Sequence, residues 1–156
     1  MSRLNILKDW LDECMADHVH CRHGVESETI LPTRVLEILP EAPDATKEDL
    51  LGSRLRLENK VDDTTKDPLG LRLRITNRAE RGRYIALSHC WGTNTPLKTT
   101  ARNLKEHEQR IGWNDLPVTF QDAVLMAAYI GIPYIWIDSL CIIQGEIPRV
   151  STSMPC

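Results

Sequence analysis

The sequence has no long hydrophobic run and no excess of charge of either sign. No apolar segment approaches the ~20 residues that a membrane-spanning helix needs, so no such helix is expected. With 19 basic and 22 acidic residues the net charge is −3, which gives no global reason to expect binding to nucleic acid or to a membrane surface. The five cysteines are an odd number without a secretory segment, which favours reduced thiols in an intracellular, cytoplasmic protein.

The length and composition are those of an ordinary globular domain. The 156 residues fit one domain, and 42% hydrophobic with 26% charged residues lie near the globular average. Residues 4–18 carry apolar side chains at roughly helical spacing, which predicts an N-terminal helix. The last residues, 145–156, show no periodicity, and we expect them to be poorly ordered.

Four short segments with an extended pattern follow that helix. They are residues 33–38, 54–58, 71–75 and 84–88. Leucine alternates with arginine in the second and third, and a period of two places one face in the core and one in water. We therefore expect an antiparallel layer. Pairing of the second and third strands would align four arginines: Arg54, Arg56, Arg72 and Arg74. Such a face is either a site for a phosphate-rich ligand or acidic partner, or a solvated face.

The pattern becomes helical in the second half of the chain. We expect one helix over residues 99–111. A second helix is expected to start with the capping pair Thr119 and Asp122 and to stop at Gly131. The apolar run at residues 134–138 then predicts a parallel strand that is buried on both faces.

Strands 84–88 and 134–138, joined by these helices, form a βαβ unit, since the crossover is long enough for a parallel connection. The segments SHCWG, residues 88–92, and DSLC, residues 138–141, then leave the sheet at the same carboxyl edge. Open α/β sheets bind their ligands at that edge. The two motifs should therefore face one another.

Five residues at this edge are candidates for ligand binding: Ser88, His89, Trp91, Gly92 and Asp138. His89 could donate to a ribose or phosphate and Trp91 could stack on a base, while Gly92 would let the backbone approach the ligand. The alternative is a packed corner in which Cys90 and Trp91 are buried and Ser88 bonds to backbone.

Two residues of the second motif also allow two interpretations. Asp138 either caps the following turn through backbone N–H groups or reaches the ligand. Cys141 lies among apolar residues, which favours an inert buried thiol, whereas a cysteine hydrolase would need His89 opposite it. No nucleophile–base–acid triad can be assigned within residues 88–92, because adjacent side chains point apart.

Soft metal ligands gather near the end of the N-terminal helix. Cys14, His18 and Cys21 are spaced i, i+4 and i+7, on one helix face. They could bind zinc, with His23 as the fourth ligand after the helix ends. The spacing is not that of a standard zinc finger. The alternative is that the cysteines belong to the packing face and the histidines to solvent.

Three motifs in order, YIALSHCWG, LPVTFQDAV and YIWIDSLCIIQ, resemble the fungal heterokaryon-incompatibility (HET) domain. The upstream segments WLDECMADHVHC and LPTRVLEI look like the leader that often precedes that domain. The resemblance covers nearly all of residues 10–144. It implies a module of non-self recognition whose activation triggers growth arrest or cell death.

The resemblance also implies a fold and a reaction. HET domains are considered similar to Toll/interleukin-receptor (TIR) domains, which have a flavodoxin-like α/β fold. The implied fold is a partial parallel sheet with crossover helices, preceded by an N-terminal helix and short antiparallel strands. Some TIR domains cleave NAD when they oligomerise, using a glutamate. NAD is thus the implied substrate, and the implied partner is a second copy or another incompatibility protein.

The resemblance divides the chain into a leader at 1–83, the front half of a HET domain at 84–144 and a divergent tail at 145–156. HET domains usually continue past this point into a segment whose glutamate corresponds to the TIR catalytic acid. After Gln144 the nearby acid is Glu146, which matches no motif. The alternative expectation is therefore a non-enzymatic interaction module or an inactive truncated fragment.

Overall fold

The structure is a computed structural model that describes residues 3–21, 28–39, 69–90 and 97–145. Several predictions fall outside these ranges: the strand at 54–58 with Arg54 and Arg56, the residues His23, Trp91, Gly92 and Glu146, and the tail from 146 onward. No helix within the described ranges is both long and apolar enough to cross a lipid bilayer.

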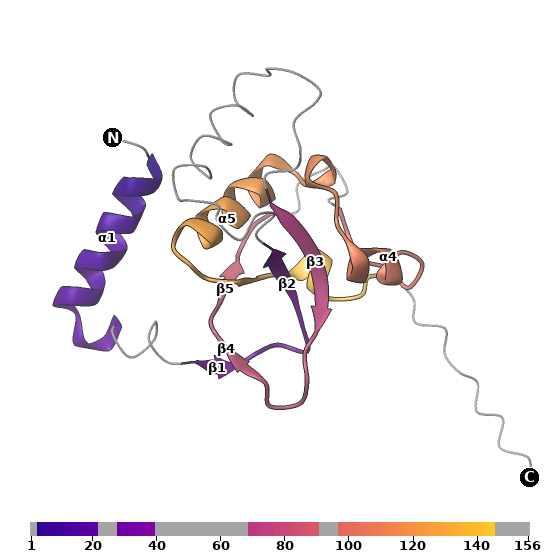
Figure 1. Ribbon diagram of the computed structural model, residues 1–156, viewed down its shortest axis with the longest axis horizontal. Coiled ribbons are helices and arrows are strands. Elements are labelled where there is room, and N and C mark those ends of the chain that lie inside the picture. Colours follow the sequence, from indigo (N-terminus) through magenta and orange to yellow (C-terminus); the bar gives the residue numbers. More distant parts are fainter. Residues whose placement is uncertain (1–2, 22–27, 40–68, 91–96, 146–156) are drawn as a thin grey trace, which may run out of the picture.

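A four-stranded mixed sheet forms the centre of the fold (Figure 1). Its strands, in spatial order, are β3 (Gly70–Ile75), β2 (Arg34–Leu39), β6 (Tyr134–Ile137) and β5 (Tyr84–Leu87). β2 pairs antiparallel with both β3 and β6, whereas β5 pairs parallel with β6. Two short strands, β1 (Thr29–Ile30) and β4 (Arg81–Gly82), form a separate antiparallel pair.

The predicted βαβ unit is confirmed by the register of β5 and β6, in which Tyr84 lies opposite Tyr134 and Leu87 opposite Ile137. The antiparallel layer is confirmed for β2 and β3. Within the described residues β5 takes no part in that layer, because its partner is β6. The fold is therefore mixed α/β. Strands from before and after residue 84 share one sheet, since β2 also pairs with β6.

One face of the sheet packs against helix α5 (Val118–Tyr129) and the 3₁₀ helix η1 (Trp113–Asp115). The core there contains Leu36, Leu71, Leu73, Ile135, Ile137, Trp113, Phe120, Val124 and Leu125. Each of these side chains is at most 1% exposed, and full burial of one such aliphatic side chain contributes roughly 1.5–3 kcal/mol. β6 alternates instead of being buried on both faces as predicted, because Tyr134 and Trp136 lie half-buried on its other face.

Helix α5 starts and stops for different reasons. The predicted capping pair is wrong at the start: the helix begins at Val118, so Thr119 already lies in its first turn. The carbonyl of Pro117 accepts the N–H groups of Phe120 and Gln121 instead. The predicted stop is confirmed, because Gly131 has a φ of 77°, its N–H donates to the carbonyl of Ala128, and the next N–H returns to Ala127. This is a Schellman motif.

Helix α4 (Leu104–Gln109) is shorter than the helix predicted over 99–111. The Asn103 side chain explains the late start. Its Oδ1 accepts both the N–H and the hydroxyl of Thr100, at 2.7 and 3.0 Å, and its amide donates to the carbonyl of Lys98. These bonds hold residues 98–103 in a turn that competes with the helix.

Helix α1 (Arg3–Asp17), predicted over 4–18, lies beside α5 and apart from the sheet (Figure 1). The Tyr129 hydroxyl at the end of α5 donates to the Asn5 side chain of α1. Three apolar side chains of the helix, Ile6, Leu7 and Trp10, are 37%, 41% and 63% exposed. Within the described chain, α1 therefore contributes little to the core.

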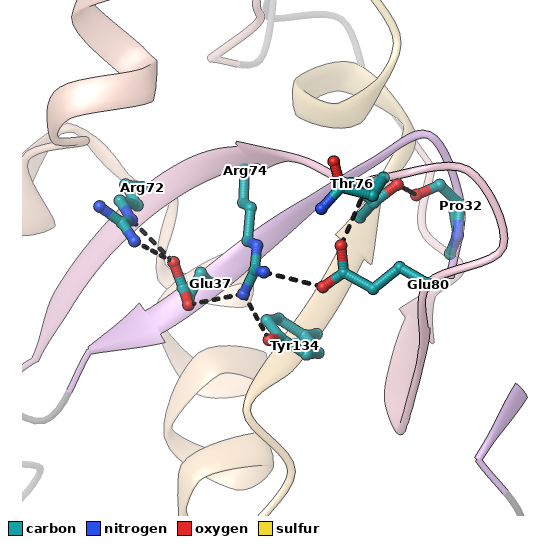
Figure 2. Close-up of polar contacts among 8 residues, drawn as sticks. Pro32, Glu37, Arg72, Arg74, Thr76, Glu80 and Tyr134 are labelled. Carbon is teal, nitrogen blue, oxygen red and sulfur yellow. Dashed lines mark hydrogen bonds and ion pairs between the residues drawn. The ribbon is translucent and has the colours of Figure 1, made fainter. Parts of the chain in front are cut away.

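The other face of the sheet carries a network of charged side chains (Figure 2). Glu37 of β2 lies opposite both Arg72 of β3 and Tyr134 of β6. Its carboxylate accepts from Arg72 at 2.7 Å and from Arg74 at 3.1 Å. Arg74 also donates to the Tyr134 hydroxyl at 2.7 Å and to Glu80 at 2.8 Å. The two described arginines of the predicted stripe are thus engaged with carboxylates, and they link three strands.

Replacement of Glu37 with Gln should destabilise the protein by about 1–2 kcal/mol, because it removes the charge that holds two arginines together. The comparison is Glu13→Gln, an exposed carboxylate on α1, which should change stability by less than about 0.5 kcal/mol. Urea unfolding followed by circular dichroism measures both. Equal effects of the two substitutions would contradict a structural role for the network.

Candidate functional site at the edge of β5 and β6

The carboxyl ends of the two parallel strands bring their following residues together, as the sequence predicts. Ser88 and His89 follow directly after β5, and Asp138 follows directly after β6 as the first residue of helix α6 (Asp138–Cys141). The Nδ1 atom of His89 lies 3.8 Å from the Oδ1 atom of Asp138. This is an ion-pair distance if the imidazole is protonated, but it is too long for a direct hydrogen bond.

His89 is placed by aromatic packing. Its side chain is only 10% exposed, and its ring meets that of Phe120 edge to face, with the centroids 4.8 Å apart. Both ring nitrogens are buried, and neither has a hydrogen-bond partner within the described residues. A buried polar atom without a partner costs about 1–3 kcal/mol. The imidazole can therefore take one ligand atom as donor and another as acceptor.

Asp138 combines the two roles that the sequence leaves open. Its Oδ1 accepts the N–H of Ser139 at 2.7 Å, so the carboxylate takes up a free N–H at the start of α6. The same oxygen faces His89. With its side chain about one third exposed, at 33%, the carboxylate can also accept hydrogen bonds from a ligand.

The other two described residues of the first motif, Ser88 and Cys90, lie at the surface. Because Cys90 is exposed, the burial of Cys90 that the packed-corner alternative requires is wrong, while Trp91 lies outside the described residues. Ser139 was missed by the sequence reasoning: it is fully buried, and its hydroxyl has no partner within the described residues. Its position directly after Asp138 in the same motif is the signal that could have identified it.

Cys141 is buried at 2% exposure in the core cluster. Burial is the main reason why the pKa of this thiol rises to about 11, above its usual 9.0. A thiol with so high a pKa is almost entirely protonated at neutral pH and is a poor nucleophile. This supports the interpretation of Cys141 as an inert core residue.

Alkylation of the native, reduced chain should therefore discriminate between its cysteines. Iodoacetamide at pH 7.5 should label the exposed Cys90 at least roughly tenfold faster than Cys141, since labelling depends on thiolate fraction and access. Peptide mass spectrometry gives both rates, and denaturation should equalise them. Fast labelling of Cys141 in the folded chain would restore the cysteine-hydrolase alternative.

A buried network of polar side chains, which the sequence did not predict, is hydrogen-bonded to α6. The Nδ1 of His107 in α4 lies 2.9 Å from the Thr99 hydroxyl, and its Nε2 lies 3.3 Å from the Asn103 amide nitrogen. Because the amide can only donate, we assign Nε2 as acceptor and Nδ1 as the protonated nitrogen. Thr99 also donates its N–H to the carbonyl of Ser139. The network thus ties α4 to α6.

The neutral state of His107 makes stability depend on pH. Burial lowers the pKa of His107 below its usual 6.5, although Glu106 and Asp115 act in the opposite direction. The unfolded chain therefore takes up a proton near pH 6.5 that the folded chain takes up only at lower pH. The contribution of this residue is fully present above that pH and declines as the pH falls, by at most about 1.4 kcal/mol per pH unit.

This dependence can be isolated by comparing the parent with His107→Gln. The variant should lose stability at pH 7.5, and the difference between the two proteins should shrink as the pH is lowered to 5.5. Urea unfolding at both values measures it, with His20→Ala as the control for an exposed histidine. A difference that is the same at the two pH values would show that His107 does not resist protonation.

A second group of polar side chains lies away from the edge, at the end of α1. Cys14 and Cys21 are half-buried, with their Sγ atoms 3.3 Å apart, and His18 Nδ1 lies 3.4 Å from the Cys14 Sγ. The hydrogen bond to Cys21 is the main cause that raises the pKa of Cys14. The structure thus brings together the three predicted ligands that it describes.

The fold and the edge define a mixed α/β protein with a histidine and an aspartate at the carboxyl ends of two parallel strands. Residues 84–154 match the family model described as Heterokaryon incompatibility protein (HET). This match assigns residues 84–154 to a heterokaryon incompatibility domain. The match extends past Gln144, where the motif resemblance ends, to residue 154. Comparison with curated proteins and with solved structures gave no match.

Proposed function

We propose that this protein acts in fungal heterokaryon incompatibility, as a non-self recognition module whose activation leads to growth arrest or cell death. We also propose that the edge of β5 and β6 is a TIR-like nucleotide site that takes NAD. The family match supports the first part. The observation that carries the second is His89, a nearly buried imidazole beside a carboxylate, whose two nitrogens have no hydrogen-bond partner among the described residues.

The chemistry of the pair suits a ribose. Neighbouring ribose hydroxyls need both donors and acceptors, and a neutral imidazole offers one of each. The Asp138 carboxylate accepts from hydroxyl groups, as aspartate does in dinucleotide-binding folds. A ligand that reaches both ring nitrogens would also remove the cost of leaving them unpaired in the core.

Cleavage of NAD would place further demands on the same edge. As nicotinamide leaves, positive charge develops on the ribose ring, and a carboxylate close to that ring stabilises it. Asp138 supplies a carboxylate at the edge, and the exposed hydroxyl of Ser88 lies on the neighbouring strand end. Trp91 and Gly92 follow shortly after in the sequence, and the proposal assigns them to base stacking and close backbone approach.

A second candidate function is protein interaction without chemistry. The exposed apolar residues Ile6, Leu7 and Trp10 of α1 favour it, because side chains of this kind anchor many protein interfaces. In that case the edge residues would serve packing and partner contact. The two functions differ in whether the isolated protein binds NAD.

The first experiment measures NAD binding and nicotinamide release at high protein concentration, with and without a crowding agent. Calorimetry follows binding, and mass spectrometry follows release. NAD should bind the parent and the His20→Ala control equally. The variants His89→Ala and Asp138→Asn should bind at least about tenfold more weakly, since each loses a polar contact worth roughly 1.5 kcal/mol or more. Any turnover should fall by about a hundredfold or more.

The outcomes separate the alternatives. Binding without release of nicotinamide would retain the nucleotide site and remove the hydrolase activity. No binding to a chain that circular dichroism shows to be folded would remove the nucleotide proposal and leave the interaction module. Equal binding by the parent and both edge variants would place the NAD site elsewhere.

A further inference from the structure

The end of helix α1 holds a second, separate arrangement of reactive side chains. After the helix ends at Asp17, the N–H of His18 donates to the carbonyl of Cys14, and the N–H of Cys21 donates to the carbonyl of His18, both at 3.0 Å. The first bond continues the helical pattern by one residue, and the second closes a turn over residues 18–21. As a result, one ligand atom from each of Cys14, His18 and Cys21 lies within 4.8 Å of the other two.

The separations are close to those of a metal site. Zinc bonds are about 2.3 Å to sulfur and about 2.0–2.1 Å to imidazole nitrogen, so a tetrahedral site has an S–S edge of about 3.8 Å and an S–N edge of about 3.6 Å. The observed distances are 3.3 Å between the sulfurs and 3.4 Å between His18 Nδ1 and the Cys14 sulfur. Both agree with the edges of the tetrahedron to within about half an ångström.

The donor set and its surroundings favour a soft divalent cation. Two thiolates and an imidazole suit zinc, whereas magnesium and calcium require oxygen ligands. The carbonyl groups at the C-terminal end of a helix attract positive charge, and the last turn of α1 contains no basic residue to oppose a cation. Both cysteines are half-buried and His18 is exposed, so an ion can reach the site from solvent.

We propose that Cys14, His18 and Cys21 bind one zinc ion, with water in the fourth position. The ion would link the last turn of α1 to the turn that follows it. This would fix the end of a helix that the described core holds only weakly. The proposal is independent of the nucleotide site, because none of its residues belongs to the β5–β6 edge.

Cobalt provides the test, since its spectrum reports thiolate ligands and tetrahedral geometry directly. The full chain, kept reduced, is titrated with Co²⁺ and then with Zn²⁺. We expect a thiolate-to-cobalt charge-transfer band together with intense visible bands, saturating at one equivalent and displaced by one equivalent of zinc. Cys14→Ser, Cys21→Ser and His18→Ala should each weaken cobalt binding by at least about tenfold.

The matched controls are Cys90→Ser, an exposed cysteine outside the group, and His20→Ala, a nearby exposed histidine. Both should bind cobalt as the parent does, and circular dichroism checks that every variant keeps its helix content. Absence of the charge-transfer band in the folded, reduced parent would overturn the proposal. So would a band that persists unchanged in the Cys14→Ser, Cys21→Ser double variant.

Discussion

The position of β6 between β2 and β5 is the constraint on which the rest of the structure depends. Its parallel pairing with β5 sends both chains out at the same edge, and its antiparallel pairing with β2 joins that unit to the N-terminal strands. Ile135 and Ile137 hold β6 there because both are completely buried. Without this strand β5 would be separated from the β3–β2 pair, and His89 would lose the carboxylate that it faces.

Local pattern was sufficient to predict much of this fold. Alternation in β3 predicted the burial of Leu71 and Leu73, since it depends only on the pleat, whereas Ile75 at the strand end is 54% exposed. The change of period between β5 and β6 predicted a parallel crossover, and from that crossover the meeting of His89 with Asp138 follows geometrically. The three motifs in order were likewise enough to predict the HET domain that the family model matches.

The remaining features depend on partners that are distant in sequence or on competing local bonds. Glu37 gave no sequence signal, because its arginine partners lie on a strand whose pairing with β2 the pattern did not specify. The predicted start of a helix was wrong where the hydrogen bonds of one residue competed with the periodic pattern. Asn103 holds a turn ahead of α4, and the carbonyl of Pro117 starts α5 ahead of the predicted capping pair. The bonds of His107 require Thr99 to be held by α6, which no local pattern encodes.

Residues that hold the fold together and residues of the candidate site differ in whether their buried polar groups have hydrogen-bond partners. Glu37 and His107 have partners at hydrogen-bonding distance, and they tie elements together. Within the described residues, five buried side-chain atoms lack a partner, and three of them belong to His89 and Ser139 beside the end of β6. Each such atom costs free energy that better packing could recover. Their concentration at the edge where parallel strands end is the basis of the proposed ligand site, because a ligand bound there would supply the missing bonds.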